Sequence, residues 1–397
     1  MSQFAKQHLI DPEICIRCYT CENTCPIEAI THNDDNVVVD FEKCNYCMDC
    51  IPVCPTGSID EWRVVSTPYT VEEQFEFEEL PNQEEFETEE GGDESTIEAL
   101  DDEIANLLAE AHSGAGGKTK APDSASKPTI NLYNLGKPIE VTIQGNYRLT
   151  DDPEHDVRHL ILDAGSVPLP LLEGQSVGVI APGVDDAGKA HLPRLYSISS
   201  PRDGERPNYN NFSLTVKRED KGLCSNYLCD LQQGDKIQIT GPFGSTFLMP
   251  NDPEAKMLMI CTGTGSAPFR AFTMNRQRTS PDLTDSMTLV FGARTEASLP
   301  YFGPLKKIPD GFLRKYLVLS RVEGKSKRYV QDELLDRKDE VLSFLKEPKA
   351  HIYICGLRAM EEGVEAALSQ IAGPIDGGWE AVKSKMREEG RYHVETY

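Results

Sequence analysis

Hydrophobic positions follow two successive patterns in the C-terminal two-thirds of the chain. From Asn131 onward, short apolar runs punctuated by Gly and Pro predict antiparallel strands, the pattern of a barrel, at residues 139–145, 158–163, 176–181, 211–218 and 235–240. After Pro253 the runs alternate with helical segments, which predicts a parallel sheet of the nucleotide-binding type. Its predicted strands are 256–261, 287–291, 316–320 and 351–355, with helices beginning at Ala267 and Ala359. We therefore expect a β-barrel domain at 131–252 and an α/β domain at 253–397.

The first 62 residues carry one cysteine pattern twice, Cys-x2-Cys-x2-Cys-x3-Cys-Pro, at 15–26 and at 44–55. This spacing holds paired [4Fe–4S] clusters in bacterial-type ferredoxins, where the fourth cysteine of each run ligates the other cluster. We therefore assign one cluster to Cys15, Cys18, Cys21 and Cys54. The other is assigned to Cys44, Cys47, Cys50 and Cys25. Two zinc sites or a disulfide scaffold are the alternatives, but zinc ribbons use pairs of Cys-x2-Cys rather than triplets followed by Cys-Pro.

This small α+β module, residues 1–62, has almost no apolar core, so the clusters themselves must hold it together. Each cysteine run is followed by a short apolar segment that predicts a strand, at 29–30 and at 58–59.

A strongly acidic stretch, residues 63–130, predicts a flexible linker between this module and the barrel. Between Arg63 and Lys118 there is no Lys or Arg but there are 17 Asp and Glu, which supply most of the net charge of −25. Within it, Ile97, Leu100, Ile104, Leu107 and Leu108 share one face of a short amphipathic helix. That helix can bind a partner or dock on its own domains, and the sequence favours neither.

Composition narrows the class of protein further. The chain of 397 residues has room for two or three domains. Its acidity argues against nucleic-acid binding, which needs a basic surface. Residues 1–10 lack a signal-peptide pattern, and no apolar run is long enough to cross a bilayer. Cysteines used as cluster ligands fit a reducing compartment, so we expect a cytoplasmic protein without a membrane partner.

Three motifs of the C-terminal part carry nucleotide chemistry. Arg194-Leu-Tyr-Ser197 predicts a strand whose Arg can pair a pyrophosphate and whose Tyr can lie against a flavin ring, although an ordinary exposed strand has the same pattern. Gly222-Leu-Cys-Ser225 opens a helix, and a helix N-terminus binds phosphate. Thr262-Gly-Thr-Gly265 joins a buried strand to a helix and lets a pyrophosphate approach the backbone, without being the Gly-x-Gly-x-x-Gly fingerprint.

Two basic segments bear on the choice of coenzyme. Ser320-Arg321 follows an apolar strand, and Lys327-Arg328-Tyr329 comes six residues later. A cationic pocket with a hydroxyl and a ring suits a 2′-phosphate and an adenine, whereas an NAD site would place a carboxylate on the ribose. A solvated basic loop is the alternative interpretation.

Residues 131–397 resemble plant- and cyanobacterial-type ferredoxin–NADP+ reductases. The matching landmarks are Asn131-Leu-Tyr, Glu173-Gly-Gln-Ser-Val-Gly-Val, Arg194-Leu-Tyr-Ser, Leu214-Thr-Val-Lys217, Gly222-Leu-Cys-Ser-Asn, Gly263-Thr-Gly, Tyr353-Ile-Cys-Gly-Leu357 and His393-Val-Glu-Thr-Tyr397. The resemblance implies a site that binds FAD through Arg194, Leu195, Tyr196, Ser197, Thr215, Val216, Lys217, Gly222, Leu223, Cys224 and Ser225. The further nucleotide contacts that it implies are Thr262, Gly263, Gly265, Arg294, Ser320, Arg321, Lys327, Tyr329, Gln331, Gly356 and Leu357. It also implies that Ser197, Cys355 and Glu395 line the hydride-transfer site and that Tyr397 stacks on the flavin.

The combination of a two-cluster ferredoxin module, an acidic linker and such a reductase resembles the reductase components of benzoyl-CoA oxygenases, the benzoyl-CoA 2,3-epoxidase systems of aerobic benzoate degradation. That resemblance implies electron flow from NADPH through FAD and two [4Fe–4S] clusters to a separate di-iron oxygenase. Two alternatives stay open. The protein could be an NADP–ferredoxin reductase that supplies another oxygenase or a general ferredoxin pool, or its N-terminal module could serve only for docking.

Overall fold

The computed structural model describes residues 5–45, 47, 49–50, 53–56, 58–59, 62–81, 119–184, 188, 191–207 and 209–396. The predicted amphipathic helix at 97–108 and the predicted flavin-stacking residue Tyr397 lie outside these residues. None of the described helices is long and apolar enough to cross a membrane.

The N-terminal module is built from two small antiparallel sheets. Strand β1 (Ala5–His8) pairs with β4 (Trp62–Val65), and β2 (Ile30–His32) pairs with β3 (Val37–Val39). A short helix, α1 (Thr20–Thr24), lies inside the first cysteine run. The strand predicted at 58–59 does not form, because these residues make a turn that buries Ile59 completely. The apolar core consists of Ile10, Ile30, Val37, Val39 and Ile59 together with Cys21 and Cys50.

The predicted linker begins later than residue 63. Strand β4 belongs to the first sheet, and α2 (Val71–Phe75) starts with a capping box formed by Thr70 and Glu73. The buried Gln74 then bonds to the β3 backbone, donating to the carbonyl of Val39 at 2.9 Å and accepting from its N–H at 3.2 Å. Residues 63–81 are therefore part of the N-terminal module.

The predicted linker also ends earlier than residue 130. The Ser126 hydroxyl accepts hydrogen bonds from Arg202 at 2.6 Å and from Asn251 at 2.9 Å. The carbonyl of Thr129 accepts one from Gln175 at 3.0 Å. The prediction of linker is wrong at 119–130, because these residues pack on the reductase part, and it remains open only for 82–118.

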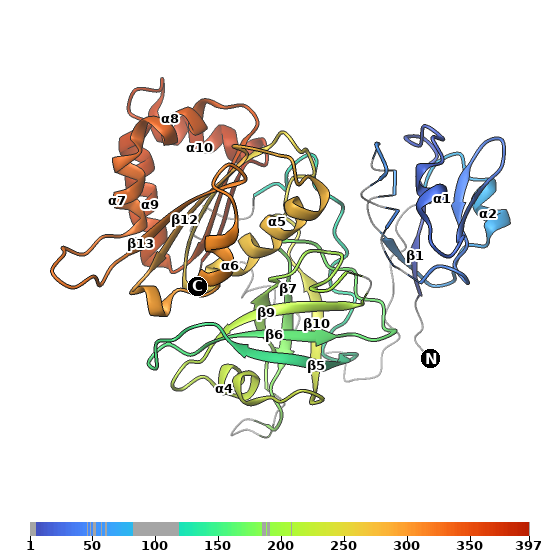
Figure 1. Ribbon diagram of the computed structural model, residues 1–397, viewed down its shortest axis with the longest axis horizontal. Coiled ribbons are helices and arrows are strands. Elements are labelled where there is room, and N and C mark those ends of the chain that lie inside the picture. Colours follow the sequence, from blue (N-terminus) through green and yellow to red (C-terminus); the bar gives the residue numbers. More distant parts are fainter. Residues whose placement is uncertain are drawn as a thin grey trace.

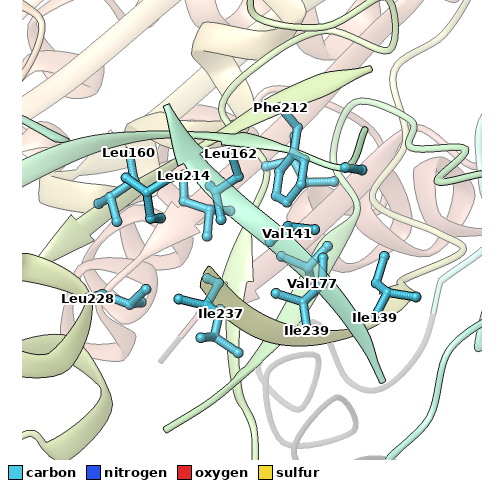
Figure 2. Close-up of a cluster of buried hydrophobic side chains, with 14 of the residues drawn as sticks. Ile139, Val141, Leu160, Leu162, Val177, Phe212, Leu214, Leu228, Ile237 and Ile239 are labelled. Atoms are coloured by element: carbon cyan, nitrogen blue, oxygen red, sulfur yellow. The ribbon is translucent and has the colours of Figure 1, made fainter. Parts of the chain in front are cut away.

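The second part is an antiparallel barrel, as predicted. Its sheet has the order β8-β7-β10-β5-β6-β9, and a bridge between Ile198 and Leu214 joins the two outer strands. The inward-facing aliphatic side chains fill the interior (Figure 2). Helix α4 (Leu223–Asp230) closes one end with the fully buried Leu228. The strands are β5 (Ile139–Arg148), β6 (Val157–Asp163), β7 (Ser176–Ile180), β8 (Arg194–Ser197), β9 (Asn211–Lys217) and β10 (Lys236–Phe243).

The third part is a parallel five-stranded sheet with the order β13-β12-β11-β14-β15 and helices on both faces (Figure 1). Helices α7 to α10 cover one face, and α5 and α6 cover the other. The strands are β11 (Lys256–Thr262), β12 (Met287–Ala293), β13 (Leu313–Leu319), β14 (Ala350–Gly356) and β15 (Tyr392–Thr396). The helices are α5 (Ser266–Thr279), α6 (Phe302–Lys307), α7 (Val330–Asp336), α8 (Lys338–Lys346), α9 (Arg358–Ile371) and α10 (Gly378–Glu388), with short 3-10 turns η2 (Gly263–Gly265) and η3 (Glu296–Ser298).

Candidate functional site

Electrostatic interactions link the eight cysteines mainly within the two groups that their spacing predicts, with a weaker one between the groups, from Cys21 to Cys50. In the first group, charge repulsion from Cys54 opposes ionisation of the Cys18 and Cys21 thiols, and Cys15 has the same effect on Cys21. In the second, charge repulsion from Cys25 raises the pKa of Cys47, and repulsion from Cys44 and Cys47 raises that of Cys50. We call the first group (Cys15, Cys18, Cys21, Cys54) cluster site 1. The second group (Cys25, Cys44, Cys47, Cys50) is cluster site 2.

Cluster site 2 lines one cavity. Its four cysteines face a largely apolar space that is also lined by His8, Ile27, Ala29, Ile30, Val39 and Asn45. Four thiols around an apolar cavity are the donor set and the surroundings that a [4Fe–4S] cluster needs. Among the described residues, no three His, Cys, Asp or Glu side chains converge on a single ion.

Burial and hydrogen bonding shift the pKa values of the cluster-site thiols in opposite directions. Burial raises the pKa of Cys21 to about 11 and that of Cys50 to about 12. A hydrogen bond from the Thr20 side chain lowers the pKa of Cys18. Burial opposes a similar change at Cys54, but the hydroxyls of Ser58 and Thr56 lower its pKa overall. Because iron binds the thiolate, loading of these sites releases protons from the buried thiols.

The predicted FAD residues Arg194, Tyr196 and Cys224 come together where β8 lies beside the start of α4. Tyr196 packs against the barrel core, where burial and the nearby Cys224 raise the pKa of its hydroxyl, while the charge of Arg194 lowers the pKa of both groups. Arg194 itself is exposed at the first position of β8, with Leu195 and Ser197 half-buried behind it. A ring beside a cationic guanidinium at a barrel edge can hold an isoalloxazine and its pyrophosphate.

Gly222 and Ser225 shape the beginning of α4. A Cβ atom at Gly222 would overlap the Ser225 hydroxyl, which donates to the Gly222 carbonyl at 3.2 Å and accepts from the Glu219 N–H at 3.2 Å. Leu223, the next residue, is 55% exposed. Because α4 begins at this turn, its first N–H groups have no acceptor within the helix, which suits a phosphate.

The side chains of the predicted FAD residues on β9 contact other residues of the protein. The Thr215 hydroxyl lies 2.6 Å from the hydroxyl of Tyr301, and the Val216 side chain is completely buried in the barrel core. Lys217 forms an exposed ion pair with Glu219 at 2.6 Å. Only the backbone groups of Thr215 and Val216 are therefore available to bind a cofactor.

The nucleotide loop after β11 touches the loop after β14. A Cβ atom at Gly265 would overlap the carbonyl oxygen of Cys355, and one at Gly356, whose φ is +143°, would lie 2.7 Å from the Thr262 hydroxyl. Both positions therefore require glycine. The Thr262 hydroxyl is buried without a hydrogen-bond partner in the part of the chain that the structure describes. A buried donor at a glycine-lined edge fits a bound nucleotide.

Cys355 and Glu395 meet at the carboxyl edge of neighbouring parallel strands. They are paired in the register of β14 and β15, and burial raises the pKa of the Cys355 thiol well above its ordinary value. Burial raises the pKa of Glu395 to about 8, so its carboxyl is mostly protonated at neutral pH. Ser197, predicted for the same site, lies at the end of β8 opposite Ser176 in the barrel sheet.

The basic residues predicted for the 2′-phosphate lie at the carboxyl edge of β12 and β13. The Arg321 N–H donates to the carbonyl of Arg294 at 2.7 Å, which holds these two segments together. Arg321 and Lys327 are exposed and form no ion pair with a residue that the structure describes. Arg328 instead pairs with Glu333 at 2.9 Å and Asp336 at 2.7 Å. Tyr329 and Gln331 stand at the start of α7, and Leu357 stands just before α9.

A buried polar network that the sequence motifs do not reveal joins the barrel to the α/β part. Arg270 on α5 donates to both oxygens of Glu205 at 2.7 Å and to the carbonyl of Ser199 at 2.7 Å. Glu205 also accepts from Ser213 at 2.9 Å and lies 3.4 Å from His159. This network holds the two nucleotide-binding parts in a defined orientation.

Comparison with known proteins identifies the three parts of the chain. Family models match at residues 7–65 (4Fe-4S dicluster domain), 153–247 (Oxidoreductase FAD-binding domain) and 259–366 (Oxidoreductase NAD-binding domain). A ferredoxin–NADP reductase of Thermosynechococcus vestitus is 36% identical, and the match covers 77% of this chain and 85% of that protein. One of Cyanophora paradoxa is 37% identical over 70% of this chain and 83% of that protein.

Solved structures agree with the sequence relatives. The ferredoxin–NADP+ reductase of Plasmodium falciparum has a TM-score of 0.53 at 28% identity, covering 68% of this chain and 99% of that one. Its structure with 2′P-AMP has a TM-score of 0.54 at 26% identity, covering 68% of this chain and 100% of that one.

The chain belongs to the ferredoxin–NADP reductase family. It is an oxidoreductase with an FAD-binding barrel, an NAD(P)-binding domain and an N-terminal 4Fe–4S dicluster domain. The predicted fold class is thereby confirmed.

Proposed function

We propose that this protein is the NADPH-dependent reductase component of a benzoyl-CoA oxygenase. Electrons would pass from NADPH to FAD, then to two [4Fe–4S] clusters, and then to a separate di-iron oxygenase that epoxidises benzoyl-CoA in the cytoplasm. The observation that carries the electron path is the gathering of eight cysteines into two groups of four, in the same chain as two nucleotide sites. The oxygenase partner rests on the resemblance of the whole architecture.

FAD would be held by the residues around β8 and α4. Arg194 would pair its pyrophosphate, Tyr196 would lie against its ring, and the first turn of α4 from Gly222 to Ser225 would receive its phosphate. When bound, FAD accepts a two-electron hydride and releases electrons singly, which connects a nicotinamide to one-electron centres.

The choice of NADPH rests on the basic edge of β12 and β13. Arg321, Lys327 and Arg294 are exposed cations, and the hydroxyl of Ser320 lies beside them in sequence. A 2′-phosphate offers Arg321 and Lys327 the ion pair that they lack within the described chain. The solved Plasmodium falciparum relative with 2′P-AMP supports this choice.

The nicotinamide would enter the edge formed by Thr262, Gly265, Cys355 and Glu395. The glycines allow close approach of the ring and phosphates to the backbone, and the protonated Glu395 carboxyl would donate a hydrogen bond within the site. We propose that Ser197 lines this site from the barrel side. Tyr397 would stack on the flavin until the nicotinamide displaces it.

Reconstitution with purified components tests the proposal. The protein should contain about one FAD and about eight iron atoms per chain. With NADPH, O2, benzoyl-CoA and the di-iron oxygenase it should support formation of the epoxide and water, and its rate with that oxygenase should exceed its rate with a bacterial ferredoxin acceptor. A higher rate with the ferredoxin would favour the alternative of a general NADP–ferredoxin reductase.

A Cys18→Ser variant distinguishes electron transfer from docking. If the N-terminal module carries electrons, the variant should still reduce FAD with NADPH but should lose transfer to the oxygenase. Cys229→Ser, at a buried cysteine of the barrel outside both cluster sites, is the matched control. Full activity of the Cys18→Ser variant with the oxygenase would mean that the module only docks.

A further inference from the structure

The two cluster sites are related by the internal duplication, so every position near one site has a counterpart near the other. Cys18 corresponds to Cys47 and Cys54 to Cys25, each 29 residues apart in the sequence. The duplication therefore provides its own comparison between the surroundings of the two clusters. These surroundings differ at the positions closest to the ligand sulfurs.

Hydroxyl groups donate to the ligand sulfurs of cluster site 1. The Thr20 hydroxyl donates to Cys18 Sγ at 3.3 Å. The Ser58 hydroxyl lies 3.2 Å from Cys54 Sγ, and the Thr56 hydroxyl lies 3.7 Å from it. A cysteine bound to iron is a thiolate and has no proton to give, so these hydroxyls must be the donors in the loaded protein.

The counterparts of the three hydroxyl residues at cluster site 2 cannot donate from a hydroxyl. Ala29 stands at the position of Ser58, and its buried methyl group replaces the hydroxyl, so this residue donates to Cys25 Sγ through its backbone N–H alone, at 3.3 Å. Ile27 stands at the position of Thr56 and lines the apolar cavity of the site. Asp49 stands at the position of Thr20, and its carboxylate disfavours negative charge on the Cys47 sulfur.

The sites also differ in exposure and in the charges beside them. Cys18 is exposed, whereas its counterpart Cys47 is only partly exposed; the corresponding pair Cys21 and Cys50 are both buried. Lys43 lies next to Cys44, but its charge is paired with Asp40 at 3.0 Å.

These differences act on the reduction potential. One-electron reduction of a [4Fe–4S] cluster adds one negative charge to the cluster and its four thiolates. Hydrogen bonds to the sulfurs and contact with water stabilise the added charge and raise the potential. An apolar cavity and a nearby carboxylate oppose the added charge and lower it.

We propose that cluster site 1 has the higher reduction potential of the two, because Thr20, Ser58 and Thr56 hydrogen-bond to its thiolates while Asp49, Ala29 and Ile27 stand in their places at cluster site 2. The inference rests on the proposed function, which loads both sites with [4Fe–4S] clusters. The first electron delivered by the flavin then resides at cluster site 1, the site with an exposed ligand. Cluster site 2 receives the second electron.

A redox titration of the whole protein, followed by EPR of the reduced clusters, tests this inference. The wild-type protein should show two one-electron steps at different potentials. Thr20→Val and Ser58→Ala should each shift the step of higher potential toward the lower one and leave the other step in place. Iron analysis should give about eight atoms per chain in each variant.

Exchanges at cluster site 2 provide the reverse test. Asp49→Thr removes the carboxylate and Ala29→Ser adds a hydroxyl four residues after Cys25, as Ser58 stands four residues after Cys54. Both should raise the step of lower potential and narrow the gap. These two variants also decide the question if a substitution at cluster site 1 prevents cluster assembly.

Three outcomes would overturn the inference. They are two steps of equal potential in the wild-type protein, a shift of the lower step by Thr20→Val and Ser58→Ala, or a shift of the higher step by Asp49→Thr and Ala29→Ser. A wild-type protein with only four iron atoms would instead refute the proposed two-cluster function, and the iron count recognises that case before any titration.

Discussion

We expect Glu395→Gln to change the way in which the stability of the protein depends on pH. Burial raises the pKa of Glu395 in the folded protein to about 8, against an ordinary value of 4.5. Between these pH values the unfolded chain releases a proton that the folded protein keeps. The free energy of unfolding therefore falls as pH rises through this window, and it levels off above pH 8.

The size of the effect follows from the two pKa values. Each pKa unit corresponds to about 1.36 kcal/mol, so the full difference amounts to roughly 4 to 5 kcal/mol. The side chain is half-buried, and solvent at the open side of the site screens part of this penalty. We therefore expect wild type to lose about 2 to 4 kcal/mol more than Glu395→Gln between pH 5 and pH 8.5.

Urea unfolding between pH 5 and pH 9, followed by circular dichroism, measures this difference. The control is Glu388→Gln, at an exposed carboxylate near the end of α10, which should give a curve parallel to wild type. Parallel curves for wild type and Glu395→Gln would show that the carboxyl is ionised in the folded protein at neutral pH. The raised pKa and the proposed hydrogen-bond donor would then both be wrong.

Three further substitutions test the nucleotide sites and their connection. Arg321→Ala should raise the KM for NADPH at least ~10-fold, since a charged hydrogen bond is worth about 1.5 to 3 kcal/mol, and should leave NADH kinetics unchanged; an equal loss with both coenzymes would place the 2′-phosphate elsewhere. Arg270→Ala strands the buried Glu205 carboxylate and should cost about 3 to 5 kcal/mol in urea unfolding, so a loss below about 1 kcal/mol would contradict the network. Gly265→Ala should weaken NADP+ binding in equilibrium dialysis because its methyl group overlaps the Cys355 carbonyl, and unchanged affinity would contradict this close contact.

Regular elements with a strong pattern could be predicted from the sequence. The barrel strands and the strands of the parallel sheet appear within a few residues of their predicted positions, because each combines an apolar run with Gly or Pro boundaries. Strand β15 was not predicted as a strand. It is an edge strand of five residues whose place beside β14 depends on the rest of the sheet.

Residues 63–81 show where composition misleads. Their many carboxylates suggest a linker, yet most of those in α2 are exposed while Gln74, a polar residue, is buried between backbone groups of β3 and the helix. A polar side chain that stabilises a fold through backbone hydrogen bonds has no hydrophobic signal. The acidic composition could therefore not reveal that this segment is folded.

Some features of the candidate site could be predicted from the sequence, and others could not. The cysteine groups could be predicted because a fixed local spacing determines which sulfurs can converge. The pair of Arg270 and Glu205 could not, because the two residues are 65 positions apart and no local spacing links them. Thr215 and Val216 belong to a motif, but only the structure shows that the side chain of Thr215 contacts Tyr301 and that of Val216 fills the barrel.

Unequal cluster potentials would suit the stoichiometry of the proposed reaction. One hydride carries two electrons, and two [4Fe–4S] clusters together take up two, one each. With equal potentials, a half-reduced protein would hold its electron at cluster site 2 half of the time. With cluster site 1 higher, the remaining electron is found beside the exposed Cys18. Each electron would then leave from the same surface, and cluster site 2 would refill cluster site 1 after the first has gone.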